Sequence, residues 1–261
     1  MKIIDFHCHA FPDNIVTKAV NAIGDYYGIP MQEDGKLPTM QAFLDGDPER
    51  KVVLLATATV PRQVISINTW LSGIINDRVF GFASIHAGFE DCAGEIDRVI
   101  SLGCKGLKIH PEFQGFAIDD PGAYRIYEAA EGRLPILFHM GDDRSDLSSP
   151  ARLKKVIGDF PKLTVIGAHF GGYRAWNESL SLLCGTDVYM DTSSSLSYIT
   201  PEFARDFIRA HGADKFLFGT DFPMWSFEPE FERFNRIDLT DDEREKILHK
   251  NAEKLLGIDQ K

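Results

Sequence analysis

Cysteine is scarce in this chain of 261 residues, and the four that occur are scattered, at Cys8, Cys92, Cys104 and Cys184. No two of them form a C-x-x-C pair, so the spacing gives no sign of a disulfide framework or a cysteine-ligated metal. In a chain of this size the pattern predicts reduced thiols in a cytoplasmic protein. We expect Cys8 to be a small buried residue.

The chain also lacks an excess of basic residues, since 39 Asp and Glu outnumber 28 Lys and Arg and give a net charge of -11. A nucleic-acid partner would favour a basic stripe, so we expect none. No apolar stretch is long enough to span a bilayer, and we expect no membrane partner. The first residues resemble a strand rather than a charged and then apolar leader, so no signal peptide is expected.

No linker, internal repeat or low-complexity segment divides the chain, so we predict one domain over residues 1–261. Eight short apolar runs alternate with segments of helical periodicity. These runs are Ile3–Phe6, Val52–Ala56, Val79–Ala83, Gly106–Ile109, Pro135–Phe138, Thr164–Ala168, Val188–Met190 and Phe216–Phe218. Because they are continuous rather than alternating, they are typical of parallel strands buried on both faces.

Eight strand–helix units in this length predict an α/β fold, a (β/α)8 TIM barrel, which needs about 250 residues. The first connection, from Phe11 to about Arg50, is longer than one helix requires. Residues 24–47 within it are rich in Gly, Pro and Asp. We therefore predict a lid-like insertion after the first strand, over the mouth of the barrel.

Histidines gather where these strands end. His7 and His9 follow the first run, His110 the fourth, His139 the fifth and His169 the sixth, and Asp221 follows the eighth. The carboxyl ends of barrel strands meet at one mouth, where the catalytic residues of this fold lie. His211 and His249 fall in helical segments and are expected at the surface.

Imidazole and carboxylate ligands suit a zinc-like ion, and three histidines with one aspartate leave a position for water. Water bound to such an ion loses a proton near neutral pH and becomes a nucleophile. His7 and His9 share one strand face, so both can reach the same ion.

These residues, together with the phrases KIHP, HFGG, GTDFP and ILHKNAEKLLGI, resemble the amidohydrolase superfamily. The likeness covers nearly the whole chain and points to the amidohydrolase-related branch, which includes decarboxylases similar to aminocarboxymuconate-semialdehyde decarboxylase. The resemblance implies that His7, His9, His139 and Asp221 bind the metal. It also implies that Asp221 and His169 are catalytic, with His169 holding or deprotonating the attacking water or polarising the substrate. We expect one zinc ion, with manganese as another divalent candidate.

The fourth strand allows two interpretations. In binuclear relatives a lysine at this place is carboxylated and bridges two metals, and Lys108 could fill that role. The alternative is a cation in the inner barrel, paired with an acidic group. His110 lies on the same strand face and is predicted to contact the substrate, with Glu112 fixing its tautomer.

Substrate contacts are also expected from the loops after the strands. Arg62 follows the second strand and Arg144 the fifth, and either guanidinium could hold a substrate carboxylate by two parallel hydrogen bonds. Phe222, Met224 and Trp225 follow Asp221 and could form an apolar wall.

The favoured function is a hydrolase that acts on a small-molecule ester, lactone or amide through a metal-activated water. The alternative is a metal-dependent non-oxidative decarboxylase of a small carboxylated acid, for which the chain is short. A non-catalytic metal-binding barrel and a nuclease resembling TatD are further hypotheses. The nuclease is disfavoured by the acidic charge and by the lack of a glutamate on the fourth strand. A homo-oligomer is compatible with all four hypotheses.

Overall fold

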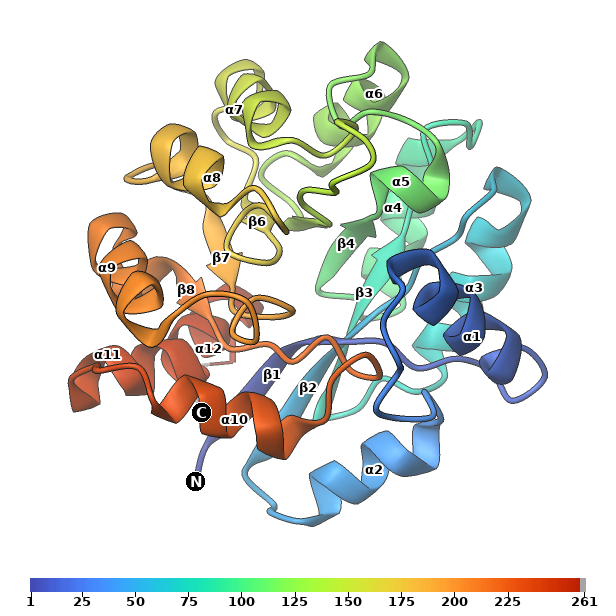
Figure 1. Ribbon diagram of the computed structural model, residues 1–261. Helices are drawn as coiled ribbons and strands as arrows, with labels where there is room; N and C mark the ends of the chain where they lie inside the picture. Colours follow the sequence, from blue (N-terminus) through green and yellow to red (C-terminus); the bar gives the residue numbers. More distant parts are fainter. Residues whose placement is uncertain (259–261) are drawn as a thin grey trace.

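The computed structural model describes residues 1–258 and shows one eight-stranded parallel sheet ringed by helices (Figure 1). The strands follow the chain in order, each paired with the next. They are β1 (Ile3–Cys8), β2 (Arg50–Leu55), β3 (Val79–Ser84), β4 (Gly106–Ile109), β5 (Ile136–Phe138), β6 (Val165–Gly167), β7 (Tyr189–Asp191) and β8 (Phe216–Leu217). The predicted (β/α)8 barrel is confirmed.

Helices lie between the strands. They are α1 (Val16–Tyr27), α2 (Leu37–Asp45), α3 (Val64–Ser72), α4 (Cys92–Ser101), α5 (Pro111–Gln114), α6 (Pro121–Ala130), α7 (Pro150–Asp159), α8 (Trp176–Leu183), α9 (Pro201–His211), α10 (Phe227–Asn235), α11 (Asp241–Glu245) and α12 (Asn251–Leu256), with short turns η1 (Pro61–Gln63), η2 (Ala213–Lys215) and η3 (Lys246–Lys250). None of these helices is both long enough and apolar enough to cross a lipid bilayer.

The barrel closes where the chain after β8 meets β1. The amide of Phe6 donates to the carbonyl of Phe218, and the amide of Asp221 donates to the carbonyl of His7, both at 2.8 Å. The amide of His9 donates to the carbonyl of Phe222 at 2.7 Å. Segments more than 200 positions apart are thus joined by backbone hydrogen bonds at the carboxyl end of β1.

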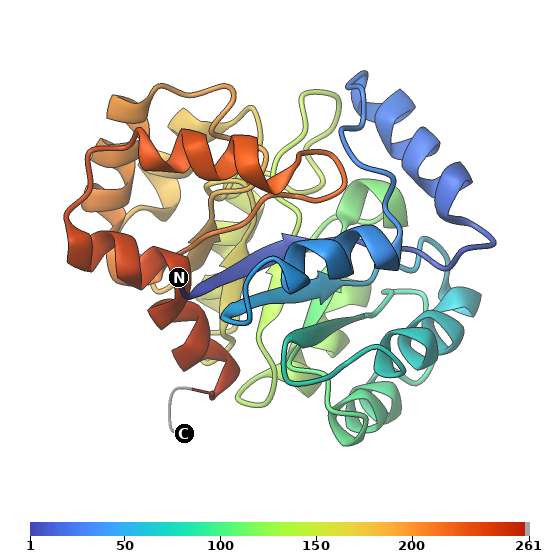
Figure 2. The same ribbon diagram turned by 90° about the horizontal axis from the view of Figure 1, so that it is seen from below.

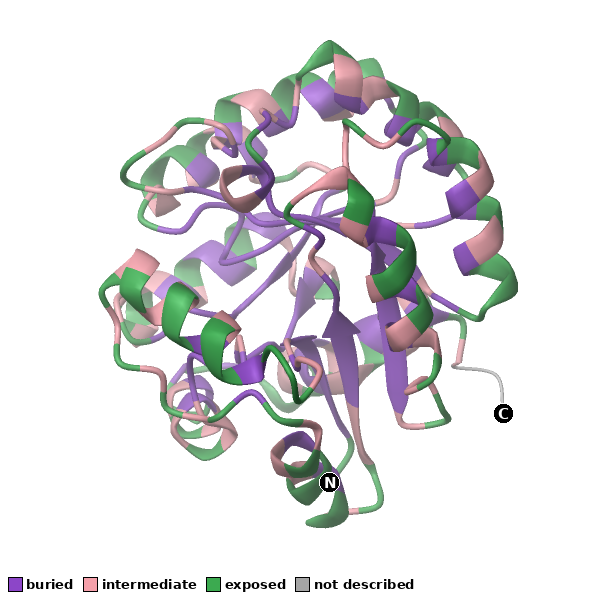
Figure 3. Cartoon of the chain, turned by 90° about the vertical axis from the view of Figure 1, so that its right-hand side faces the viewer, coloured by how far each residue is buried: buried purple, intermediate pink, exposed green. Residues whose placement is uncertain are grey.

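Apolar side chains fill both faces of the sheet, as the continuous runs predict. One cluster lies inside the barrel and includes Ile4, Phe6, Phe82 and Leu137, and α12 adds Leu256 to it. A larger cluster packs between the strands and the surrounding helices. Figure 3 shows the strands buried along most of their length, whereas the helices carry an exposed outer stripe. The remaining interior at the carboxyl ends of the strands is where polar side chains can gather.

The segment after β1 covers the cavity at the barrel mouth, as predicted, but the covering residues begin earlier than position 24. Ile15, Ala19, Ile23 and Tyr27, all in or next to α1, line the cavity. In contrast, α2 packs beside β2 as an ordinary barrel helix. Figure 2 shows α1 at the edge of the molecule, beyond the tip of β1.

The prediction that His211 lies at the surface is wrong. Its side chain is buried, and its Nε2 donates to the carbonyl of Val188 at 2.7 Å while Nδ1 accepts from the amide of Gly185. His211 therefore joins α9 to the chain that leads into β7. His249 is partly buried and pairs with Glu253 at 3.1 Å.

Replacing Thr240 with alanine should destabilise the fold, because Thr240 caps α11. Its hydroxyl accepts from the amide of Glu243, whose carboxylate accepts from the amide of Thr240. Loss of such a cap costs about 1 kcal/mol, so the urea midpoint should fall in Thr240→Ala. Thr240→Ser keeps the acceptor and should unfold like the parent; equal midpoints for all three proteins would contradict the capping role.

Candidate active site

Six of the predicted site residues line a cavity of about 530 Å³ at the carboxyl ends of the strands, and His169 lies just outside it against His139. His7, His9, His139 and Asp221 all line it, as do Lys108 and His110. The remaining wall is largely apolar and aromatic, with Phe11, Tyr26, Tyr27, Trp70 and Phe113 among its residues. The structure therefore brings together polar groups from β1, β4, β5 and the chain after β8.

A local irregularity in β1 turns His7 toward this cavity. Phe6 packs inside the barrel and Cys8 packs outside it, although residues two apart share a face in a regular strand. The pairing register with β2 shifts between Asp5 and Cys8, and this accounts for the change. Bulges of this kind often re-aim a side chain beside a functional site. Cys8 is buried, as expected.

His7, His9 and Asp221 form a group of potential metal ligands that faces the cavity. Nε2 of His7 and Nε2 of His9 each lie 3.4 Å from Oδ1 of Asp221. A tetrahedral zinc site with bonds of about 2.1 Å places neighbouring ligand atoms about 3.4 Å apart. The separation of these three atoms therefore suits a shared divalent ion.

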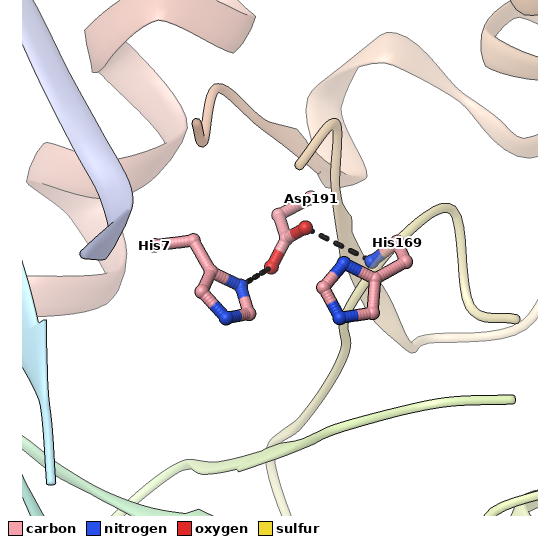
Figure 4. Close-up of side chains that lie close together, drawn as sticks. All are labelled: His7, His169 and Asp191. Atoms are coloured by element: carbon pink, nitrogen blue, oxygen red, sulfur yellow. Dashed lines mark hydrogen bonds and ion pairs between the residues drawn. The ribbon is translucent and has the colours of Figure 1, made fainter. Parts of the chain in front are cut away.

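Hydrogen bonds leave lone pairs on the inward nitrogens of both rings. Nδ1 of His7 lies 2.8 Å from Oδ2 of Asp191, and Nδ1 of His9 lies 3.1 Å from the carbonyl of Leu55. Since a carbonyl or an ionised carboxylate only accepts, each Nδ1 carries the hydrogen and each Nε2 is free to bind a metal. Figure 4 shows Asp191 between His7 and the backbone of His169.

His139 and His169 face each other beside this group. Nδ1 of His139 lies 3.0 Å from Nε2 of His169. Their other nitrogens face the carbonyls of Gly141 and Ser193, both at 3.1 Å, and therefore carry the hydrogens. Two lone pairs thus point at each other, an arrangement that a cation or a shared proton would relieve. The ligand atoms of His7, His9 and Asp221 all lie within 4.8 Å of one another and fit a divalent metal, whereas His139 falls in a separate group with His110 and Glu112.

The protonation states of the buried histidines and of Asp221 are the ones that metal binding requires. Burial, and next the nearby Lys108, lower the pKa of His7 to about 4. Burial also lowers the pKa of His139 and of His169, so these rings are neutral at pH 7. Burial acts to raise the pKa of Asp221, but its histidine neighbours and their hydrogen bonds hold that pKa well below the usual range. Neutral imidazole and ionised carboxylate are the forms that bind metals.

Lys108 is fully buried, and its Nζ lies 3.5 Å from Nε2 of His7. Burial lowers its pKa to about 8, while Asp221, Asp191 and Glu112 act to raise it. Within residues 1–258 no carboxylate lies within 4.0 Å of Nζ, so the expected ion pair is not formed. Its position next to His7 puts the lysine on the floor of the cavity.

His110 is held by stacking rather than by Glu112. Its ring lies between those of Phe113 and His139, with both centroids 4.0 Å away. Nδ1 of His110 is 3.7 Å from Oε2 of Glu112, and both atoms are buried without a hydrogen-bond partner. The expected hydrogen bond that would fix the tautomer is therefore absent. The hydroxyl of Tyr27 lies 3.3 Å from Nε2 of both His110 and His139.

Neither predicted arginine lines the cavity. Arg62 lies in η1 with an exposed side chain. Arg144 stacks on Tyr26, with its guanidinium carbon 3.8 Å from the ring centroid, and pairs with Asp142. The hydroxyl of Tyr26 also donates to Asp142 at 3.0 Å. Arg144 thus fastens the end of α1 to the loop after β5, outside the cavity.

Of the three residues proposed as an apolar wall, Met224 lines the cavity, whereas Phe222 and Trp225 pack behind it.

Sequence analysis missed three polar residues of one loop. Asp191 ends β7, and Ser193 and Ser194 follow it. Burial acts to raise the pKa of Asp191, but His7 and several hydrogen bonds hold it below the usual range. The run of polar residues MDTSSS directly after the seventh apolar run could have identified this loop.

The sequence was compared with models of protein families and with curated proteins, and the fold with solved structures. A family model described as Amidohydrolase matches residues 4–258. No curated protein matches the chain.

Solved structures share the fold at low sequence identity. An uncharacterised TIM-barrel protein from Bordetella bronchiseptica has a TM-score of 0.80 at 22% identity, with 99% of each chain covered. A dihydroxybenzoic acid decarboxylase from Polaromonas sp. JS666, solved with manganese and 2-nitroresorcinol, has a TM-score of 0.76 at 16% identity, covering 100% of this chain and 98% of that one. A probable 2-pyrone-4,6-dicarboxylic acid hydrolase from Acinetobacter baumannii has a TM-score of 0.72 at 16% identity, covering 98% and 100%.

Replacing both His7 and His9 with alanine should abolish metal loading, because two of the three closest ligand atoms are removed. Plasma mass spectrometry of the purified protein should then show metal at background, with a far-ultraviolet circular dichroism spectrum like that of the parent. His249→Ala, which removes a histidine outside the cavity, should keep its metal. Normal loading of the double variant would refute the ligand assignment.

Proposed function

The chain belongs to the amidohydrolase family, and from this premise we propose that it is a metal-dependent hydrolase of a small-molecule ester, lactone or amide. The observation that carries the proposal is the ionised Asp221, whose Oδ1 lies 3.4 Å from the inward nitrogens of His7 and His9. A carboxylate in this place is a base beside a set of metal ligands, which is what activation of water requires.

We assign the metal ligands to His7, His9, His139 and Asp221. One divalent ion held by them would polarise the substrate carbonyl and lower the pKa of a water molecule. Zinc suits the nitrogen-rich donor set. Manganese is the second candidate, since two structurally similar decarboxylases were solved with it.

The residues of this chain would then move the proton. Asp221 accepts a proton from the attacking water at a carboxylate oxygen and passes it to the leaving group. The free Nε2 of His169 faces His139 and can accept a hydrogen bond from the water. Lys108 and His110 contact the substrate from the floor and the side of the cavity, and α1 covers it and limits the entry of solvent.

Decarboxylation of a small carboxylated acid is the second candidate. The aromatic wall of the cavity suits a planar substrate, and similar structures include decarboxylases of dihydroxybenzoate and 5-carboxyvanillate. Chain length does not disfavour it, because this chain covers 98% of the dihydroxybenzoic acid decarboxylase. This reaction needs an acid to protonate carbon, whereas Asp221 is ionised and His169 neutral at pH 7. The charges of these two groups favour hydrolysis, and Lys108, whose pKa of about 8 leaves it protonated at pH 7, is the acid that decarboxylation would have to use.

A substrate panel separates the two reactions. The metal-loaded protein should release new acid groups from lactones or esters, followed by pH-stat titration. With carboxylated phenols it should release no carbon dioxide, measured by a coupled assay. Carbon dioxide as the product would replace the hydrolase with the lyase.

Replacing Asp221 with asparagine should lower kcat about a hundredfold or more, the scale of a lost general base. Asp221 has a φ of 71°, a conformation that asparagine tolerates well, so the backbone should be unchanged. Asp143→Asn changes an exposed carboxylate near the mouth and should leave kcat unaffected. A near-normal rate for Asp221→Asn would exclude Asp221 as the base.

A further inference from the structure

The loop that follows β7 reaches three of the groups around the cavity. Asp191 accepts from Nδ1 of His7, and the carbonyl of Ser193 accepts from Nδ1 of His169. The hydroxyl of Ser194 donates to Oδ2 of Asp221 at 2.6 Å. Nearly consecutive residues thus orient groups that come from three other parts of the barrel.

The hydroxyl of Ser194 is itself held in one direction. The indole Nε1 of Trp225 donates to Oγ of Ser194 at 3.0 Å. The hydroxyl can donate either to Oδ2 of Asp221 at 2.6 Å or to Sδ of Met224 at 3.5 Å, and its hydrogen points to Asp221 because the carboxylate is the nearer and stronger acceptor. Ser194 is 3% exposed and Trp225 is 8% exposed, so water does not compete strongly for either group.

The hydrogen bond from Ser194 to Asp221 determines which oxygen of Asp221 faces the histidines. Oδ2 is engaged by Ser194, and Oδ1 is the atom near Nε2 of His7 and His9. Ser194 and Asp221 both have left-handed backbones, with φ of 47° and 71°. Residues stay in such conformations when the surrounding structure imposes them, often at functional sites.

We propose that Ser194 is a positioning residue that fixes the rotation of the Asp221 carboxylate, and that Trp225 acts through Ser194. Asp221 then presents a single oxygen, Oδ1, to the metal and to the water. The inference rests on the proposed role of Asp221, and it adds a chain of two donors, Trp225 and Ser194, that makes that role possible.

A double-mutant cycle tests this chain of donors. Ser194→Gly removes the hydroxyl and accepts a φ of 47° without strain. Trp225→Phe keeps a ring and removes the N–H. Ser195→Ala is the matched control, because the neighbouring hydroxyl donates to the carbonyl of Ser193 and not to Asp221.

In Ser194→Gly, kcat on the ester or lactone turned over by the parent should fall about tenfold, the scale of a hydrogen bond to a charged group, with KM little changed. Trp225→Phe should show a smaller loss, and the double variant should be no slower than Ser194→Gly. Ser195→Ala should match the parent. An unchanged kcat in Ser194→Gly, or losses that multiply in the double variant, would overturn the proposal.

Binding of Mn²⁺ gives a readout that does not depend on turnover. Titration followed by electron paramagnetic resonance should show weaker binding in Ser194→Gly than in the parent or in Ser195→Ala, at equal melting temperatures of the metal-free proteins. Equal Mn²⁺ affinity would refute the positioning role. If Asp221→Asn retained its rate while Ser194→Gly bound Mn²⁺ more weakly, the proposed function would fail and the positioning role would stand.

Discussion

The buried carboxylate of Asp191 is the contact on which the geometry of the cavity depends. Its two oxygens accept from Nδ1 of His7, from the amides of His169 and Ser193 and from the hydroxyl of Ser193. A carboxylate with so many donors stays ionised although no water reaches it. One side chain at the end of β7 thereby fixes the His7 tautomer and joins β1 to the left-handed turn at His169.

Closure of the barrel supplies the second constraint. The side chains of His7 and Asp221 come together because the backbone of residue 221 is hydrogen-bonded to the backbone of residue 7. The shift in register within β1 then turns the imidazole inward. The same contacts that complete the sheet therefore set the distance between these two groups, so the stability of the barrel and the shape of the site are coupled.

The sequence predicted the barrel and the gathering of His7, His9, His139, His169 and Asp221, because strand ends in this fold must meet at one mouth. It did not predict the contributions of Asp191 and Ser194, whose importance arises from contacts with residues far away in the chain. Arg62 and Arg144 were chosen by their place after a strand, but the direction of a long side chain depends on its neighbours, and Tyr26 captures Arg144. His211 was misplaced because helical periodicity does not show which helix face meets the sheet.

The reactive groups of the cavity and the helix that covers it, α1, come from different parts of the chain. The groups that would carry out chemistry come from β1, β5, β6 and the chain after β8, whereas Ile15, Ala19 and Ile23 belong to a segment outside the barrel. That segment is held at its far end by Tyr26 and Tyr27, and Val16 and Val20 are buried nearer its start. Changes at Ile15, Ala19 and Ile23 can therefore alter which molecules are admitted without touching the polar groups beneath, whereas a change at Tyr27 would also reach His110 and His139.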